Sequence, residues 1–106
     1  MNETFITKLG DHRGGKRIWI EGKRLVNAGF EAGVMYQRDW TPNTLTLTLL
    51  YEDDIVTSKP SLVSAKGDKP IIDITGQRVA NHFPNCDKVA VTYKQGVITI
   101  EGIPNA

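Results

Sequence analysis

Apolar and polar residues alternate along several stretches of this chain. The clearest case is residues 44–50, where Leu45, Leu47 and Leu49 alternate with three threonines. A period of two is typical of a β-strand with one buried face. Helical spacing is confined to short stretches, of which Lys23–Ala28 would make about two turns. The pattern therefore predicts a mainly β protein with short helices, a β-rich α+β fold.

The chain also contains an internal repeat. Residues 18–28 (IWIEGKRLVNA) align with residues 72–82 (IDITGQRVANH), and five of the eleven positions are identical. The identical pairs are Ile18 and Ile72, Ile20 and Ile74, Gly22 and Gly76, Arg24 and Arg78, and Asn27 and Asn81. After a gap at Gly29, the alignment continues through Phe30 with Phe83 and Trp40 with Tyr93. It predicts two β-β-α-β-β units, residues 5–50 and 61–101, joined by a connector at 51–60.

The first unit should contain four strands and one helix. We expect them at Phe5–Leu9, Arg17–Glu21, Lys23–Ala28 (the helix), Val34–Trp40 and Thr44–Leu50. The first two strands should form a hairpin that turns at Gly14-Gly15, and the last two should turn at Pro42-Asn43. Leu25, Val26 and Ala28 should face inward, with Gly29 as a left-handed helix cap and Phe30 over the core.

The second unit repeats this order. We expect strands and a helical turn at Ser61–Ala65, Ile71–Thr75, Gln77–Phe83 (the helical turn), Lys88–Tyr93 and Val97–Glu101. The connector could hold a short strand at Ile55–Thr57. About fifty residues bury too little apolar surface to be stable alone, so both units should pack into one barrel-like domain, residues 1–106.

Composition narrows the class of protein. A chain of 106 residues with 40% hydrophobic residues forms one small domain, which excludes a large multidomain enzyme. We find no apolar run of about 20 residues and no signal-like N-terminus, so we expect a cytoplasmic protein with no membrane partner. A lone Cys86 excludes an internal disulfide, and with two histidines it offers no zinc ligand set. We expect no metal and no cofactor.

Charge is balanced overall but clustered locally. The chain contains thirteen Lys and Arg and twelve Asp and Glu, which gives a net charge of +1. Nucleic-acid binding would therefore need a local basic patch. Residues 8–24 carry a net charge of +4, and their candidate phosphate-binding side chains are Lys8, His12, Arg13, Lys16, Arg17, Lys23 and Arg24. Glycines 14 and 15 would let backbone amides approach phosphates, with the start of the helix beside them. The alternative is that these residues only keep the surface soluble.

Other candidate chemistry is weaker. His12 and His82 could act as an acid and a base on RNA, but one falls in a predicted turn and the other at a predicted helix end. The acidic residues lack the spacing of a two-metal site. Four aromatic residues could stack on bases, although packing within strands is favoured: Trp19, Tyr36, Trp40 and Tyr51. We therefore predict no enzymatic activity.

The motif of residues 18–33 resembles that of a known superfamily. It reads I-x-I-x-G-x-x-L-x-x-A-G-F-x-x-G, and it is similar to the SymE-type branch of the AbrB-like swapped-hairpin superfamily. The resemblance implies a barrel of interleaved hairpins, here as an intramolecular pseudo-dimer because the repeat supplies both units. The second unit departs from the motif, since His82 directly precedes Phe83 and Asn85-Cys86-Asp87 replaces the last glycine.

Three functions remain open. The resemblance implies DNA binding, as in AbrB and the antitoxin members, or the toxin role assigned to SymE, which would act on RNA or DNA. We favour a small, non-catalytic nucleic-acid-binding protein, with DNA preferred over RNA. The other alternative is a phage or mobile-element protein that inhibits a host protein such as a defence nuclease. The expected state is a monomeric pseudo-dimer, with a homodimer as the alternative.

Overall fold

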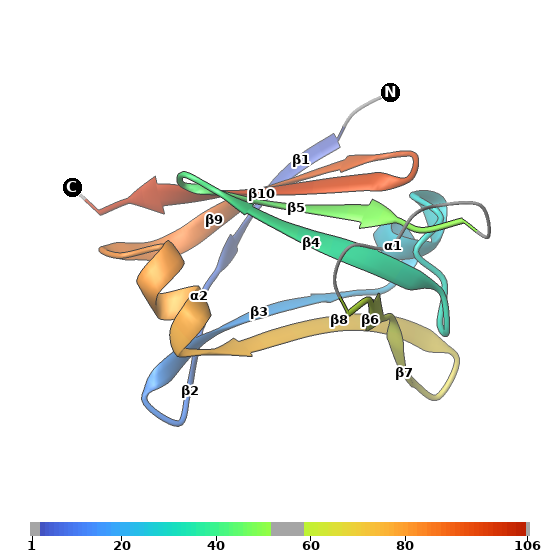
Figure 1. The fold of residues 1–106 in the computed structure, drawn as a ribbon, viewed down its shortest axis with the longest axis horizontal. Coiled ribbons are helices and arrows are strands. Elements are labelled where there is room, and N and C mark those ends of the chain that lie inside the picture. The colour runs from blue at the N-terminus through green and yellow to red at the C-terminus, as the bar shows by residue number, and fades with distance from the viewer. Residues whose placement is uncertain (1–2, 52–58, 106) are drawn as a thin grey trace.

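The computed structural model describes residues 3–51 and 59–105, except for the side chain of His12 (Figure 1). The described residues form two antiparallel sheets and two short helices, so the prediction of a mainly β fold is confirmed. In chain order the elements are β1 (Glu3–Lys8), β2 (Gly10–His12), β3 (Gly15–Glu21), α1 (Lys23–Asn27), β4 (Met35–Thr41), β5 (Thr44–Leu49), β6 (Ser61–Leu62), β7 (Ser64–Lys66), β8 (Lys69–Gly76), α2 (Gln77–His82), β9 (Cys86–Lys94) and β10 (Val97–Pro104). The strand predicted at Ile55–Thr57 lies outside the described residues.

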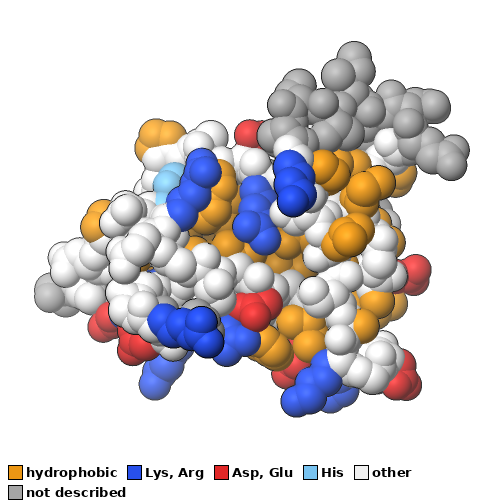
Figure 2. Space-filling model, turned by 60° about the horizontal axis from the view of Figure 1, so that its bottom comes forward, with side chains coloured by type: hydrophobic (Ala, Val, Ile, Leu, Met, Phe, Trp, Pro, Cys, Tyr) orange, Lys and Arg blue, Asp and Glu red, His pale blue; other side chains and the backbone are white. Residues whose placement is uncertain are grey.

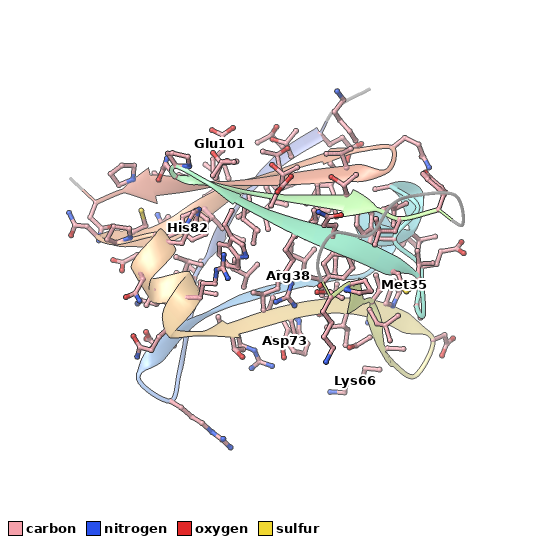
Figure 3. The ribbon with its side chains drawn as sticks, in the orientation of Figure 1. Met35, Arg38, Lys66, Asp73, His82 and Glu101 are labelled. Carbon is pink, nitrogen blue, oxygen red and sulfur yellow. The ribbon has the colours of Figure 1, made fainter. Side chains whose placement is uncertain are left out.

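The two sheets face each other. The larger sheet, sheet A, has the strand order β1-β9-β10-β5-β4-β6, and the smaller sheet, sheet B, has the order β2-β3-β8-β7. Helix α1 joins the sheets at one end of the molecule and α2 joins them at the other (Figure 1). Figure 3 shows Glu101 on the outer face of sheet A, Asp73 on the outer face of sheet B and Arg38 between the sheets.

The strand pairing is symmetric between the two halves of the chain. In sheet B, Trp19 of β3 lies opposite Asp73 of β8, and these two residues occupy equivalent positions in the aligned repeat. In sheet A, Thr46 of β5 lies opposite its own counterpart, Thr99 of β10. An approximate twofold axis therefore passes between the members of each pair, and each element of the first half has an equivalent in the second.

The first strand of each half pairs with the other half. Strand β1 pairs along its length with β9, and β6 pairs with β4. The prediction that Phe5–Leu9 forms a hairpin with Arg17–Glu21 is therefore wrong. The chain leaves sheet A at Leu9, whose side chain is buried and whose N–H donates to the carbonyl of Asp87. The short β2 then forms the hairpin with β3, and its turn falls at Arg13-Gly14, because Gly15 already belongs to β3.

The core fills the space between the sheets. Both faces contribute alternating residues, among them Ile18, Ile20, Leu45, Leu47, Ile72, Ile74, Ile98 and Ile100. Leu25, Ala28 and Phe30 are buried and Gly29 has a φ of +92°, as predicted. Val26 does not face inward: it is exposed because α1 is a single turn whose buried side is taken by Leu25. Neither helix of the described residues has the length and apolar character needed to cross a bilayer.

Candidate nucleic-acid interface

The β2–β3 hairpin carries the centre of the predicted basic cluster. Its turn residues Arg13 and Gly14 both have positive φ, and the Gln77 side-chain amide donates to the Gly14 carbonyl over 3.1 Å. Gly15 lies so close to Gly76 that a Cβ added there would be 2.7 Å from the Gly76 carbonyl carbon. The tip is thus held against the start of α2, the helix of the other half.

Two of the predicted cations already have carboxylate partners. The Lys16 ammonium donates to Asp11 over 2.9 Å, and this hydrogen bond raises the pKa of Lys16 above its usual value. Arg17 makes a bidentate ion pair with Asp73, in which Nε donates to Oδ1 and Nη2 donates to Oδ2, both over 2.8 Å. The hydrogen bond to Asp73 raises the pKa of Arg17. Both pairs are solvent-exposed and therefore weak, so a phosphate could replace either carboxylate.

The remaining predicted residues are spread over the fold. Lys8 lies in sheet A opposite Lys88. Lys23 and Arg24 follow the far end of β3, so a seven-residue strand, about 23 Å long, separates them from the hairpin tip. The expectation that the helix start lies beside this tip is therefore wrong for α1. Arg24 instead stacks on the ring of Phe5, with 3.5 Å between the guanidinium carbon and the ring centroid.

A second basic tip occupies the equivalent place in the other half. The β7–β8 hairpin turns at Gly67-Asp68 and carries Lys66 and Lys69 on either side, both exposed. The two tips lie at opposite ends of sheet B (Figure 1), and Lys66 lies beyond the outer face of the sheet (Figure 3). Among the described residues, no carboxylate lies within ion-pair distance of Arg13, Lys66 or Lys69.

A basic groove that sequence reasoning missed opens between β4, β8 and α2. Its volume is about 400 Å³, and it is lined by Arg38, Trp40, Lys59, Ile74, Thr75, Arg78 and Val79. Three of these side chains are cationic, and no acidic residue of the described chain is among them. Figure 2 shows Lys and Arg side chains around a hollow with a hydrophobic floor. The three cations are far apart in sequence and form no run, so only Arg78, aligned with Arg24, gave any signal.

Contacts with the Trp40 ring fix the positions of two side chains beside the groove, those of Arg78 and His82. The Arg78 guanidinium lies over Trp40, 4.7 Å from the ring centroid, and the His82 ring meets the same indole edge-on at 4.9 Å. His82 Nε2 is 2.7 Å from the carbonyl of Thr44, so Nε2 carries the proton and donates. Arg38 Nε is buried without a hydrogen-bond partner among the described residues, and its Nη2 reaches only the Tyr36 hydroxyl, at 3.5 Å.

The predicted aromatic residues do not form one stacking face. Tyr36 is buried in the core and Trp40 is half-buried in the groove. Trp19 is exposed on the outer face of sheet B under the Arg17 guanidinium, at 4.3 Å, and Tyr51 is exposed after β5. The packing interpretation is therefore correct for Tyr36, and Trp19 contacts one of the predicted phosphate-binding side chains, Arg17. Cys86 is buried.

Comparison with known proteins does not distinguish between the functions that the sequence leaves open. No protein-family model, no curated protein and no solved structure matches this chain. Within residues 3–51 and 59–105, no group of three or more His, Cys, Asp or Glu side chains is placed to hold a metal ion. Any functional conclusion therefore rests on the geometry of the hairpin tips and the groove.

Proposed function

We propose that this chain is a small, non-catalytic nucleic-acid-binding protein that contacts phosphates through the two hairpin tips of sheet B. The observation that carries the proposal is the pair of basic hairpin tips, Arg13 with Lys16 and Lys66 with Lys69, at opposite ends of one sheet. Phosphate contacts from Lys and Arg supply most of the sequence-independent affinity for nucleic acid. Gly14 at the first tip exposes backbone that can approach a phosphate closely.

Duplex DNA is the preferred ligand in this proposal. A twofold arrangement of contacts suits a duplex, whose two strands are themselves related by twofold symmetry. The exchange of β1 and β6 between the halves also supports our interpretation of the chain as one domain, a swapped-hairpin pseudo-dimer of AbrB or SymE type. In this interpretation the two tips belong to equivalent hairpins of the two units.

The test is fluorescence anisotropy with labelled duplex DNA and single-stranded RNA at low and physiological salt. For duplex DNA, the logarithm of affinity should fall with a slope of about −0.9 per neutralised phosphate. Replacing Arg13 and Lys16 by alanine should weaken binding and reduce the slope by about two. Lys88→Ala with Lys94→Ala removes the same charge from sheet A and should change little. An equal loss in both double variants would contradict the assignment of binding to the hairpin tips.

A protein partner is the second candidate. Met35 of β4 and Leu62 of β6 lie opposite each other and both are exposed, which favours contact with another protein. Absence of binding to both DNA and RNA, together with capture of a host protein that a Leu62→Lys variant no longer captures, would favour this inhibitor-like role. Shortened RNA on a gel, or growth arrest on expression, would favour the toxin role.

A further inference from the structure

The twofold relation gives the groove a counterpart that serves as an internal comparison. Beneath α1, a hollow of about 200 Å³ is lined by residues that include Arg24, Asn27 and Tyr93. Arg24 is aligned with Arg78, and Tyr93 is aligned with Trp40. Both halves therefore place an arginine from the helix near an aromatic side chain from the long hairpin.

Two other positions differ between the halves. Beside α1, Phe5 of β1 lies opposite Val91 of β9, and Val91 is buried. Beside α2, β6 begins at Ser61, opposite Tyr36 of β4. The equivalent places are taken by Arg38, two residues after Tyr36, and Lys59, two residues before Ser61, and both line the groove. Positions that are apolar beneath α1 are thus cationic beneath α2.

The fold does not require these cations. Beneath α1 the same place is filled by Phe5, which packs on Tyr93 and carries Arg24 on its face. Beneath α2, Arg38 instead leaves its Nε buried without a partner in the described chain, which destabilises the folded protein. An anion in the groove would accept hydrogen bonds from Arg38 and balance the three positive charges.

We propose that this groove binds a phosphomonoester, the 5′-phosphate of a nucleotide. Arginine and lysine are the side chains that bind phosphate most often, and a phosphomonoester dianion offers three accepting oxygens to Arg38, Lys59 and Arg78. The volume of about 400 Å³ lies within the range of small-molecule sites. Trp40, which is only partly buried and lines the groove, gives the sugar or base an aromatic surface to contact.

The nucleotide could be free or could be the phosphorylated end of a strand, because both present the same group. The site is separate from the hairpin tips of the proposed function, since its cations come from β4, α2 and the segment before β6. Loss of binding at one site therefore leaves the other testable.

The experiment titrates the full chain carrying Trp19→Phe, so that Trp40 is its single tryptophan, and follows indole fluorescence. The probes are AMP, adenosine, inorganic phosphate and a tetranucleotide with or without a 5′-phosphate. The key variant combines Arg38→Val with Lys59→Phe, which copies the residues found beneath α1 and should therefore fold. The matched control combines Lys88→Gln with Lys94→Gln, which removes the same charge from β9, outside both the groove and the hairpin tips.

We expect saturable binding of AMP that weakens by about tenfold or more in the key variant and by less than about twofold in the control. Thermal unfolding should show that the key variant is at least as stable as the parent. Binding of AMP assigns a free nucleotide, and binding of only the phosphorylated tetranucleotide assigns a strand end. The proposal is overturned if adenosine binds as well as AMP, if no phosphorylated probe saturates by about 10 mM, or if key variant and control lose affinity equally.

Discussion

At the scale of single residues, Tyr93 shows how the contact between halves sets side-chain chemistry. Its ring is half-buried in β9 and packs edge-on against Phe5 of β1, 6.0 Å between centroids. Burial raises the pKa of the Tyr93 phenol above its usual 10.0, and the nearby Arg24 charge opposes part of that rise. The neutral phenol is therefore favoured in the folded state more than in the unfolded chain.

This shift predicts a loss of stability at high pH. Below about pH 10 the phenol is neutral in both the folded and the unfolded state. Above this pH the phenol of the unfolded chain ionises first. The free energy of unfolding therefore falls as pH rises through the raised pKa of Tyr93. Urea unfolding between about pH 8 and 11 should show a shallower fall for Tyr93→Phe than for the parent. The raised pKa of Lys16 acts in the same direction in both proteins and cancels in the comparison. Identical slopes would contradict the assignment to Tyr93.

At the scale of elements, the ends of β3 and β8 depend on three glycines. The aligned residues Gly22 and Gly76 have φ of +94° and +117°, a region that other residues rarely adopt, and each precedes a helix. Gly15, opposite this corner, has no room for a side chain because its neighbour is the Gly76 backbone. The same close approach holds the first hairpin tip beside α2.

Gly15→Ala should therefore destabilise the protein. A Cβ would lie 2.7 Å from the Gly76 carbonyl carbon and 2.8 Å from its oxygen, and backbone cannot move aside as a flexible side chain can. We expect a loss of about 1–3 kcal/mol in the free energy of unfolding, measured by urea denaturation. Gly10→Ala is the control: its Cβ would meet nothing closer than 3.7 Å, so its effect should stay within about 0.5 kcal/mol. A tolerated Gly15→Ala would mean that β3 and β8 can separate at this corner.

At the scale of the whole molecule, neither half contains a complete sheet. Each sheet is joined at its centre by a pair of strands from different halves, β3 with β8 and β5 with β10, and β1 adds a further crossing pair. A half-chain alone would expose the apolar faces that the two halves bury against each other.

Separate fragments, residues 1–51 and 52–106, should therefore be unfolded as monomers and regain β structure when mixed in equal amounts. Circular dichroism and analytical ultracentrifugation would measure secondary structure and mass. The equivalent residues of the repeat also allow a fragment to pair with its own copy, so a homodimer of residues 1–51 is an acceptable result. A folded monomer of either fragment would contradict the interdependence of the halves.

Local sequence pattern predicts most of the elements of this protein, but it missed the short β2, and the strand predicted at Ser61–Ala65 is two strands, β6 and β7. Alternation at Ile18 and Ile20 and along residues 44–50 correctly predicted β3 and β5, because strand period and burial of one face are local properties. The repeat also aligned Gly22 with Gly76, which share the same unusual conformation for the same local reason. Local pattern could not predict that β1 pairs with β9, since either partner would satisfy its hydrogen bonds.

The charges that lie side by side follow from the tertiary fold and not from the order of the chain. The basic run at residues 8–24 is divided between two ends of β3, and two of its cations are paired with Asp11 and Asp73. Arg38, Lys59 and Arg78, which no sequence pattern connects, line one groove instead. The reason is physical: a strand carries successive residues along its length, while pairing between distant strands and the packing of two sheets bring together side chains that are remote in the chain.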